Sequence, residues 1–260
     1  MESAGEGWGK GRLRNPIGLA AGYDRSGALL PQIAAHGFGF VELGTVTPCP
    51  VADHNPGVEV LAANVERWRA RAGSTRCLVG VNLGRHPGAP IEQAAQDFEQ
   101  GMRAAWRCAD YLAINLSGPA NRALLETGRE RVLRDVLRRV HNQRERLATV
   151  SGRHVPTVVK VPVVPGAAAC PAAVRYCREL GFDGVVAALE DASRADVERV
   201  LKRLARTLGR MTLIAVGGIR TPEHARAYLA AGARLVQVYR LYAEAGPLAV
   251  AGLAARCMRI

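Results

Sequence analysis

The sequence contains no apolar run long enough to span a membrane, because charged residues, glycines or prolines interrupt every candidate stretch. It also lacks the apolar core of a secretory signal near its start, since residues 1–14 mix Glu, Gly, Lys and Arg. The same stretch is too short and too acidic for a transit peptide. We therefore expect neither a secreted nor a transmembrane protein, and we take residues 1–14 as a short segment preceding the folded unit.

Metal and redox motifs are missing as well. None of the six cysteines forms a CxxC pair, and the six histidines form neither an HExxH motif nor a cluster with cysteine. This pattern predicts buried or half-buried thiols in an intracellular, reducing compartment, and no metal centre. The GxxxxGK[ST] phosphate loop, the GxGxxG turn and the GxSxG nucleophile elbow are absent too.

What the chain has in excess is positive charge, with a net value of +12. The arginines are densest in residues 122–153, where Leu133, Val136, Leu137 and Val140 recur at helical spacing. This spacing favours a solvated amphipathic helix over a nucleic-acid surface, and no aromatic side chain is interleaved to stack on bases. The sequence contains no sequence-specific nucleic-acid motif, although the net charge suits nucleic acid, anionic lipid or acidic protein partners.

Short apolar stretches alternate with longer amphipathic ones along the chain. The apolar stretches are nearly continuous, as in parallel strands covered on both faces. We predict strands over residues 17–21, 40–43, 78–81, 111–114, 157–161, 184–187, 212–216 and 235–238. We predict helices over residues 27–35, 57–72, 91–107, 122–148, 168–180, 193–208, 222–231 and from 243 towards 258. Eight such alternations, with no repeat or linker between them, predict a single-domain (β/α)8 barrel over residues 15–260 rather than a doubly wound sheet.

Functional side chains of such a barrel lie at the C-terminal ends of its strands. Asn82, Asn115 and Lys160 lie at the ends of three different predicted strands, and two amides with a lysine suit an oxygen-rich ring or an anion. Gly217-Gly218 follows the seventh strand, where barrels commonly bind phosphate. The alternative for the two glycines, a simple tight turn, stays open.

Longer stretches of the chain resemble the dihydroorotate dehydrogenase family, most closely its membrane-associated class 2. The first two matching stretches, NPIGLAAGYD over residues 15–24 and GFGFVELGTVTP over residues 37–48, are long and specific. Further matches follow in family order over residues 78–84, 111–119, 158–161, 181–184, 215–219 and 231–239. The resemblance therefore covers nearly the whole chain.

This resemblance implies an FMN-containing barrel that oxidises dihydroorotate to orotate in pyrimidine biosynthesis. In the family a serine removes a proton while hydride moves to the flavin, and class 2 members pass the electrons to a quinone. The resemblance assigns the flavin contacts to Ala20, Ala21, Gly22, Thr45, Asn82, Asn115, Lys160, Gly218 and Tyr239, to which we add Gly217 from its place after the seventh strand.

The departures from the family are concentrated on the substrate. The family's NxSSPN segment reads NLSGPAN here, so Gly118 stands at the position of the catalytic base and Ala120 at that of a substrate-binding Asn. Arg25 replaces a lysine that contacts the substrate, and it keeps the charge but not the shape. A Thr-Asn-Thr run after the sixth strand is replaced by residues 188–190, Ala-Leu-Glu.

Two stretches of the family pattern are shortened, one between Pro50 and His54 and one between Glu190 and Ser193. In the family the first carries an Asn-Arg pair that reaches flavin and substrate, and the second carries a contact to the flavin phosphate. Only 14 residues precede Asn15, so we also expect the helical extension of the class 2 quinone tunnel to be missing.

Two hypotheses follow. The first is a dihydroorotate dehydrogenase-like barrel without catalytic activity, serving as a structural or binding subunit of a larger protein or ribonucleoprotein assembly. Its mitochondrial location is implied by the resemblance alone. The alternative is an FMN-dependent oxidoreductase of the dihydroorotate dehydrogenase type with weakened or altered activity. An aberrantly spliced or mispredicted product would also explain the two shortened stretches.

Overall fold

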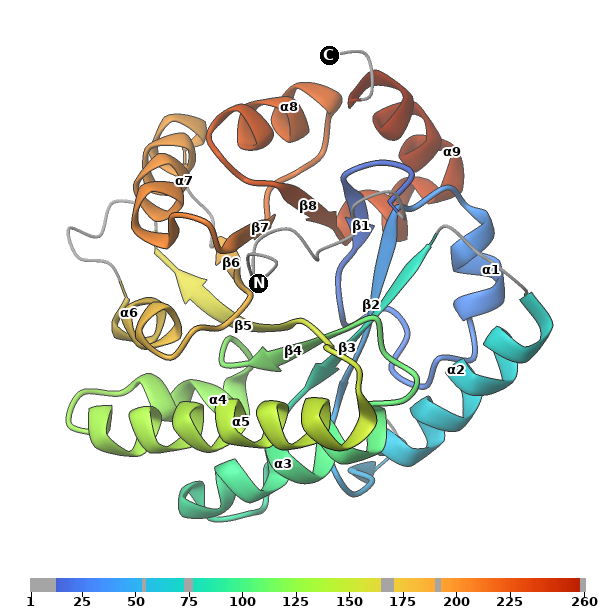
Figure 1. Ribbon diagram of the computed structural model, residues 1–260. Coiled ribbons are helices and arrows are strands. Elements are labelled where there is room, and N and C mark those ends of the chain that lie inside the picture. The colour runs from blue at the N-terminus through green and yellow to red at the C-terminus, as the bar shows by residue number, and fades with distance from the viewer. Residues whose placement is uncertain (1–12, 53–54, 73–76, 165–170, 190–192, 258–260) are drawn as a thin grey trace.

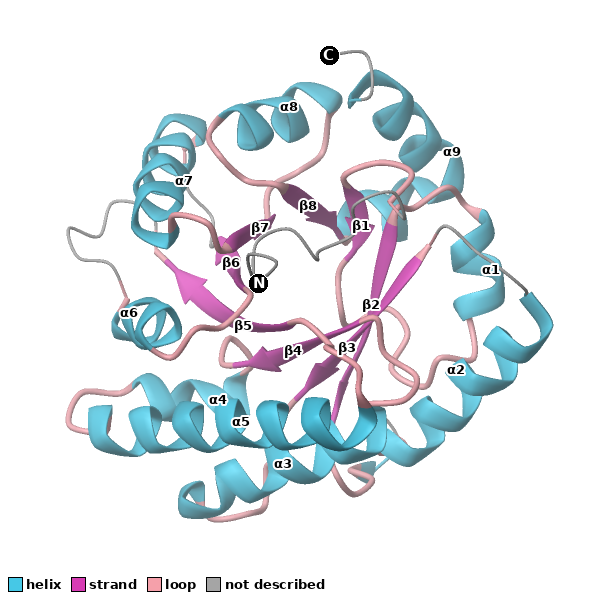
Figure 2. Cartoon of the chain, in the orientation of Figure 1, coloured by secondary structure: helices cyan, strands magenta, loops and turns pink. Residues whose placement is uncertain are grey.

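The computed structural model describes residues 13–52, 55–72, 77–164, 171–189 and 193–257. Within these residues a closed barrel of parallel strands runs in the order β1 to β8, with each strand hydrogen-bonded to its sequence neighbours and β8 closing onto β1. Figure 1 shows the strands in a central ring with the helices around them, and Figure 2 shows the same alternation by element type. The predicted (β/α)8 barrel is confirmed.

The strands lie where the continuous apolar stretches predict them. Their bounds are Ile17–Leu19 (β1), Phe40–Val46 (β2), Leu78–Leu83 (β3), Tyr111–Asn115 (β4), Thr157–Val163 (β5), Gly184–Leu189 (β6), Thr212–Val216 (β7) and Leu235–Val238 (β8). β2 extends three residues beyond its predicted end, to Val46, and β1 ends at Leu19 instead of residue 21. The chain then turns through Gly22, whose φ of 111° is readily available only to glycine.

The longer helices lie on the outside of the strand ring. Their bounds are Leu30–Ala35 (α1), Val58–Ala72 (α2), Ala94–Ala105 (α3), Glu130–Ser151 (α5), Ala172–Glu179 (α6), Arg194–Leu208 (α7), Pro222–Ala230 (α8) and Arg240–Cys257 (α9). Short turns of helix lie at Ile91–Gln93 (η2), Pro119–Arg122 (α4) and Ala123–Leu125 (η3). Thr221 caps α8 as its sequence predicts, because its side chain accepts a hydrogen bond from the His224 N–H at 3.3 Å.

The single helix predicted over residues 122–148 is wrong at its start. The chain instead forms α4 and η3, passes Gly128 at a φ of 87°, and begins α5 at Glu130. A left-handed residue interrupts the helical hydrogen-bond ladder, so the two parts cannot be continuous. The amphipathic character of α5 is confirmed, since Leu133, Val136 and Leu137 are buried. Several of its exposed arginines are in ion pairs, among them Arg138 with Asp135 at 2.5 Å.

Two apolar layers hold the barrel together. The larger one fills the space between strands and helices. The smaller one fills the barrel interior towards the N-terminal ends of the strands. The interior layer comprises Phe40, Leu78, Tyr111, Ala113, Val158, Val186, Ile214 and Leu235. Its large rings have room because glycines face them: a Cβ atom at Gly18 would overlap the Phe40 ring, and one at Gly80 would overlap the Tyr111 ring.

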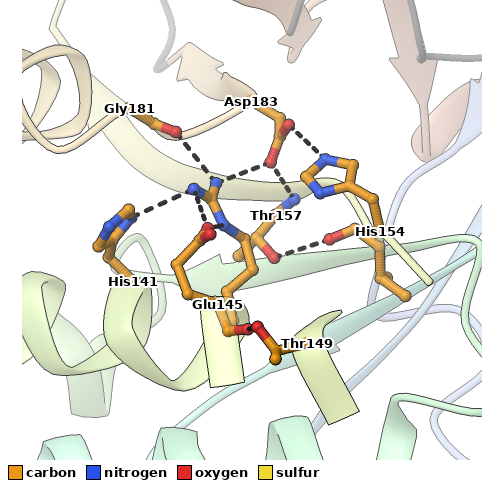
Figure 3. A network of polar contacts seen from close by, with 9 residues as sticks. His141, Glu145, Thr149, His154, Thr157, Gly181 and Asp183 are labelled. Carbon is orange, nitrogen blue, oxygen red and sulfur yellow. Dashed lines mark hydrogen bonds and ion pairs between the residues drawn. The ribbon is translucent and has the colours of Figure 1, made fainter. Parts of the chain in front are cut away.

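The N-terminal ends of β5 and β6 are joined by a polar network around Asp183, which is drawn in Figure 3. The Asp183 carboxylate accepts hydrogen bonds from the Arg144 guanidinium at 2.9 Å and from the Thr157 N–H at 2.8 Å. His154 Nε2 lies 2.8 Å from its other oxygen. This hydrogen bond raises the pKa of His154, and burial opposes it; burial and then the Arg144 charge lower the pKa of His141.

These opposite shifts predict opposite effects of pH on stability. Because the folded state holds the His154 proton more tightly, His154 stabilises the protein below pH about 6.5, and this contribution is lost as pH rises through the raised pKa. His154→Ala should therefore lower the free energy of unfolding more at pH 5.5 than at pH 8.5, by up to about 1 kcal/mol for a half-exposed group. Urea unfolding at both pH values measures the difference.

His141→Ala is the matched control, because the folded state disfavours the His141 proton. It also removes the 3.1 Å contact between Arg144 and His141 Nδ1, so it should lower the free energy of unfolding more at pH 8.5 than at pH 5.5. The same pH trend in both variants would contradict the network.

Candidate functional site

The side chain of Glu42, in the middle of β2, is completely buried inside the barrel. Its carboxylate accepts hydrogen bonds from side chains on four other strands. Oε1 accepts from Asn82 Nδ2 at 2.8 Å and lies 3.3 Å from Lys160 Nζ. Oε2 accepts from Tyr111 Oη at 3.1 Å and from Gln237 Nε2 at 2.7 Å. One carboxylate therefore ties β3, β4, β5 and β8 to β2.

The contacts of Glu42 match its negative charge. A carboxylate without water is tolerated only when it is paired and hydrogen-bonded, and Lys160 supplies the opposite charge with a side chain that is 10% exposed. Burial first, and then the Glu42 charge, raise the pKa of the Tyr111 phenol well above its usual value. The phenol consequently stays protonated and donates to the carboxylate.

Glu42, Tyr111 and Gln237 were not among the predicted site residues. A charged residue inside an otherwise apolar strand was visible in the sequence FVELG, and such a residue is rarely buried without a partner. The partners themselves come from distant parts of the chain, so only the closed barrel brings them to this carboxylate.

Thr45, at the end of β2, connects two of the predicted residues. Its hydroxyl donates to Asn82 Oδ1 at 2.6 Å and accepts from Asn115 Nδ2 at 2.8 Å. Together with the hydrogen bond from Asn82 to Glu42, this links Thr45, Asn82, Asn115 and Lys160 into one network at the C-terminal ends of the strands. We call it the mouth network.

The segment after β4 folds back on Asn115. The Asn115 Oδ1 atom accepts hydrogen bonds from the Ser117 N–H and the Ser117 hydroxyl, both at 2.9 Å, and from the Gly118 N–H at 3.1 Å. Gly118 itself has φ −70° and ψ 151°, which any amino acid can adopt. A Cβ atom there would lie 3.2 Å from Asn115 Nδ2 and 3.7 Å from Asn121 Nδ2. The backbone therefore does not require glycine at this position.

A pocket of about 300 Å³ opens beside the mouth network. Its lining includes six of the predicted residues and nine others. The predicted residues are Gly22, Arg25, Thr45, Asn115, Gly118 and Ala120; the others are Thr47, Val51, Ala52, Asn55, Gly84, Arg85, Pro87, Pro119 and Asn121. The pocket thus combines two arginines with several amide side chains.

Two of these amides lie where the sequence predicts a loss. Asn121 follows Ala120 directly and is 3% exposed, and its Oδ1 accepts from the Arg85 N–H at 3.2 Å. Asn55 follows the first shortened stretch and donates to Thr47 Oγ1 at 2.9 Å. In the sequence, Asn121 stands directly after the substituted position and Asn55 directly after the shortened stretch. This proximity was the signal that could have identified both residues. Residues 53–54 and 190–192, which include Glu190, lie outside the described residues.

Arg85 and Arg25 supply the positive charge of this pocket. The Arg85 guanidinium donates to the backbone carbonyls of Ala120 at 2.8 Å and Ala89 at 2.7 Å, so it fixes the pocket wall. Arg25 is exposed at the pocket edge.

The remaining predicted residues lie at the ends of β1, β7 and β8. The Ala20 N–H donates to the Val238 carbonyl at 2.9 Å, Ala21 follows half-buried, and a Cβ atom at Gly22 would lie 3.3 Å from the Tyr239 ring. Gly217 has a φ of 116°, and a side chain there would overlap the Leu189 carbonyl. Close packing of β6 against β7 is thus sufficient to require Gly217, whereas Gly218, at a φ of 69°, is exposed.

Two absences concern only the part of the chain that the structure describes. No group of three or more His, Cys, Asp and Glu side chains there could hold a metal ion. No helix among these residues combines the length and the hydrophobicity needed to cross a membrane.

The chain is similar to curated proteins named dihydroorotate dehydrogenase (quinone). It is 36% identical over 276 residues to dihydroorotate dehydrogenase (quinone) of Stenotrophomonas maltophilia (strain R551-3), covering 90% of this chain and 78% of the relative. It is 34% identical, with the same coverage, to dihydroorotate dehydrogenase (quinone) of Xanthomonas campestris pv. campestris (strain B100). No family model matches the chain.

Solved structures with the same fold include DHODH from Eimeria tenella in complex with ferulenol. Its TM-score is 0.77 at 24% identity, and the match covers 93% of this chain and 80% of that one. The ligand-free form from the same organism gives a TM-score of 0.76 at 24% identity, with 93% and 83% covered.

Replacing Thr45 by valine tests the mouth network. The change keeps the shape but leaves Asn115 Nδ2 without its acceptor and the buried Asn82 Oδ1 without its donor. We expect the free energy of unfolding to fall by about 1–3 kcal/mol in urea denaturation. Thr149→Val is the control, because its exposed hydroxyl donates only to a helix carbonyl, and it should change stability by at most about 0.5 kcal/mol. Equal effects of the two changes would contradict the network.

Proposed function

Because the chain belongs to the dihydroorotate dehydrogenase family, we propose that it binds FMN and acts as an oxidoreductase of the dihydroorotate dehydrogenase type, with a rate reduced by Gly118. The mouth network is the observation that carries this proposal. The amides of Asn82 and Asn115 and the charge of Lys160 meet at one end of the barrel, as the family's flavin contacts require. Relatives at 34–36% identity support the reaction class.

The donor set fits the flavin. Its ring carries carbonyl oxygens, ring nitrogens and an N–H, and asparagine amides with a lysine can satisfy both kinds of group. Asn82, Asn115, Thr45 and Lys160 would hold the ring, and the backbone N–H groups at Gly217 and Gly218 would face the phosphate. When bound, FMN supplies the acceptor for the hydride.

The pocket beside this network suits an anionic, amide-rich substrate such as dihydroorotate. Arg25 brings positive charge to the edge of the pocket, and the Asn55 and Asn121 side chains offer amide groups within it. These residues would bind and orient the substrate carboxylate and ring. The substrate site is thus rebuilt in part from residues adjacent to the missing family positions.

Removing a proton from the substrate is the step with no side chain to perform it at the family position. Gly118 has none, and the neighbouring Ser117 hydroxyl donates to Asn115 Oδ1. Loss of a positioned general base costs about two to four orders of magnitude in rate. We therefore expect slow turnover in a protein that still binds its cofactor.

Flavin binding is tested by titrating the purified full chain with FMN and following flavin fluorescence. The mouth network predicts saturation near one flavin per chain and a visible flavin spectrum in the isolated complex. Riboflavin, which lacks the phosphate, is the control ligand and should bind more weakly. A chain that takes up no FMN would contradict the proposal.

Gly118→Ser should restore the missing base. The backbone already has a conformation open to serine, and the neighbouring Asn115 amide must move by only a few tenths of an ångström. We expect dihydroorotate oxidation, measured with an artificial acceptor, to rise about 10²–10⁴-fold in kcat. Gly118→Ala adds the same Cβ atom without a hydroxyl, so it should give no such gain. An equal gain in the alanine variant would contradict a role in proton removal.

The absent base also favours a second candidate, a barrel that binds flavin without turnover and serves as a structural or binding subunit. A flavin-loaded protein that oxidises no dihydroorotate with any acceptor would support it. A mitochondrial location and a place in a larger protein or ribonucleoprotein assembly stay predictions from the sequence.

A further inference from the structure

The Glu42 carboxylate lies between the apolar interior layer of the barrel and the mouth. Phe40, two residues before it on β2, belongs to the apolar layer, and Thr45, three residues after it, belongs to the mouth network. Its side chain is 0% exposed. The carboxylate therefore contacts Asn82 and Lys160, two of the predicted flavin-binding residues, from the interior of the barrel, on the side away from solvent.

Among the described side chains that hydrogen-bond this carboxylate, Lys160 is the cation and the others are neutral donors. In a buried site the attraction between the two charges is strong, and the pair presents little net charge to its surroundings. A lysine without this partner would present a full positive charge at the mouth.

We propose that Glu42 is a positioning residue, which holds Lys160 and Asn82 at the mouth and offsets the lysine charge, and thereby limits how strongly the site favours reduced over oxidised flavin. This inference rests on the proposed function. Two-electron reduction with uptake of one proton leaves the flavin with one additional negative charge. A cation beside the ring stabilises this form, and a carboxylate 3.3 Å from that cation weakens the effect.

Glu42→Gln removes the charge at nearly constant shape, and the site can accept the amide. In glutamine, one NH₂ group would replace one carboxylate oxygen. This group would then face two donors that now hydrogen-bond to an oxygen. The Gln237 side chain has a buried oxygen with no hydrogen-bond partner, so rotation of its amide would present that oxygen as an acceptor. Tyr111 Oη can accept as well as donate. We therefore expect the variant to fold.

The test is the flavin reduction potential of the FMN-loaded protein, measured by dithionite titration against a reference dye. In Glu42→Gln the preference for reduced over oxidised flavin should increase at least tenfold, which is about 30 mV for a two-electron couple. Asp183→Asn makes the same chemical change at a buried carboxylate at the opposite end of the barrel. It should leave the potential unchanged.

A second comparison covers the case in which Glu42→Gln fails to fold. Lys160→Met should lower the potential, and Glu42→Gln/Lys160→Met, which lacks both charges, should return it close to that of the natural protein. An unchanged potential in Glu42→Gln, or no difference between Lys160→Met and the double variant, would overturn the inference alone. A natural protein that takes up no FMN would overturn the proposed function and this inference with it.

Discussion

The buried hydrogen-bonded pair of Glu42 and Lys160 constrains the whole interior of this barrel. A carboxylate in the middle of β2 is stable there only because Lys160, Asn82, Tyr111 and Gln237 converge on it from four other strands. That convergence requires a closed barrel, since the strands that supply these groups are far apart in the sequence. The same contacts fix Lys160 and Asn82 at the mouth, so the stability of the interior and the geometry of the site depend on one another.

At the mouth, next to this pair, the side chains that we propose to bind flavin are linked to one another, and the position that we propose for the base is a glycine. Hydrogen bonds connect Asn115 through Thr45 to Asn82 in the mouth network, and Asn82 donates in turn to Glu42. At Gly118 the backbone has an ordinary extended conformation, and the Asn115 amide is the neighbour that an added side chain would meet first. The absence of the base is therefore a property of one side chain and not of the surrounding fold. Family membership and the lower rate that we propose are therefore compatible in one chain.

Much of the fold could be predicted from the sequence, because strands covered on both faces produce continuous apolar runs. The helix over residues 122–148 could not be bounded correctly, since apolar periodicity continues across Gly128, whose positive φ appears only in the structure. We predicted Asn115, Lys160 and Asn82 as site residues because strand ends lie at the mouth of a barrel, and the structure places them in one hydrogen-bond network. Glu42 and Gln237 lie inside strands, and their pairing depends on the register across the barrel.

Some residues of the pocket could not be predicted from the sequence either. Matching the family position by position found Ala120 in place of an asparagine, whereas the structure places the next residue, Asn121, in the pocket wall. Close packing against the Leu189 carbonyl is sufficient to explain why residue 217 is a glycine, without a bound phosphate. A motif identifies residue types, but the space around each residue decides its role.

A crystal structure of the full chain grown with FMN would show whether the mouth network and the Glu42–Lys160 pair form a flavin site. We expect electron density for the flavin ring against Asn82, Asn115 and Lys160, with the Glu42–Lys160 contact retained. Flavin density elsewhere on the molecule, or a mouth without flavin at saturating FMN, would overturn this assignment.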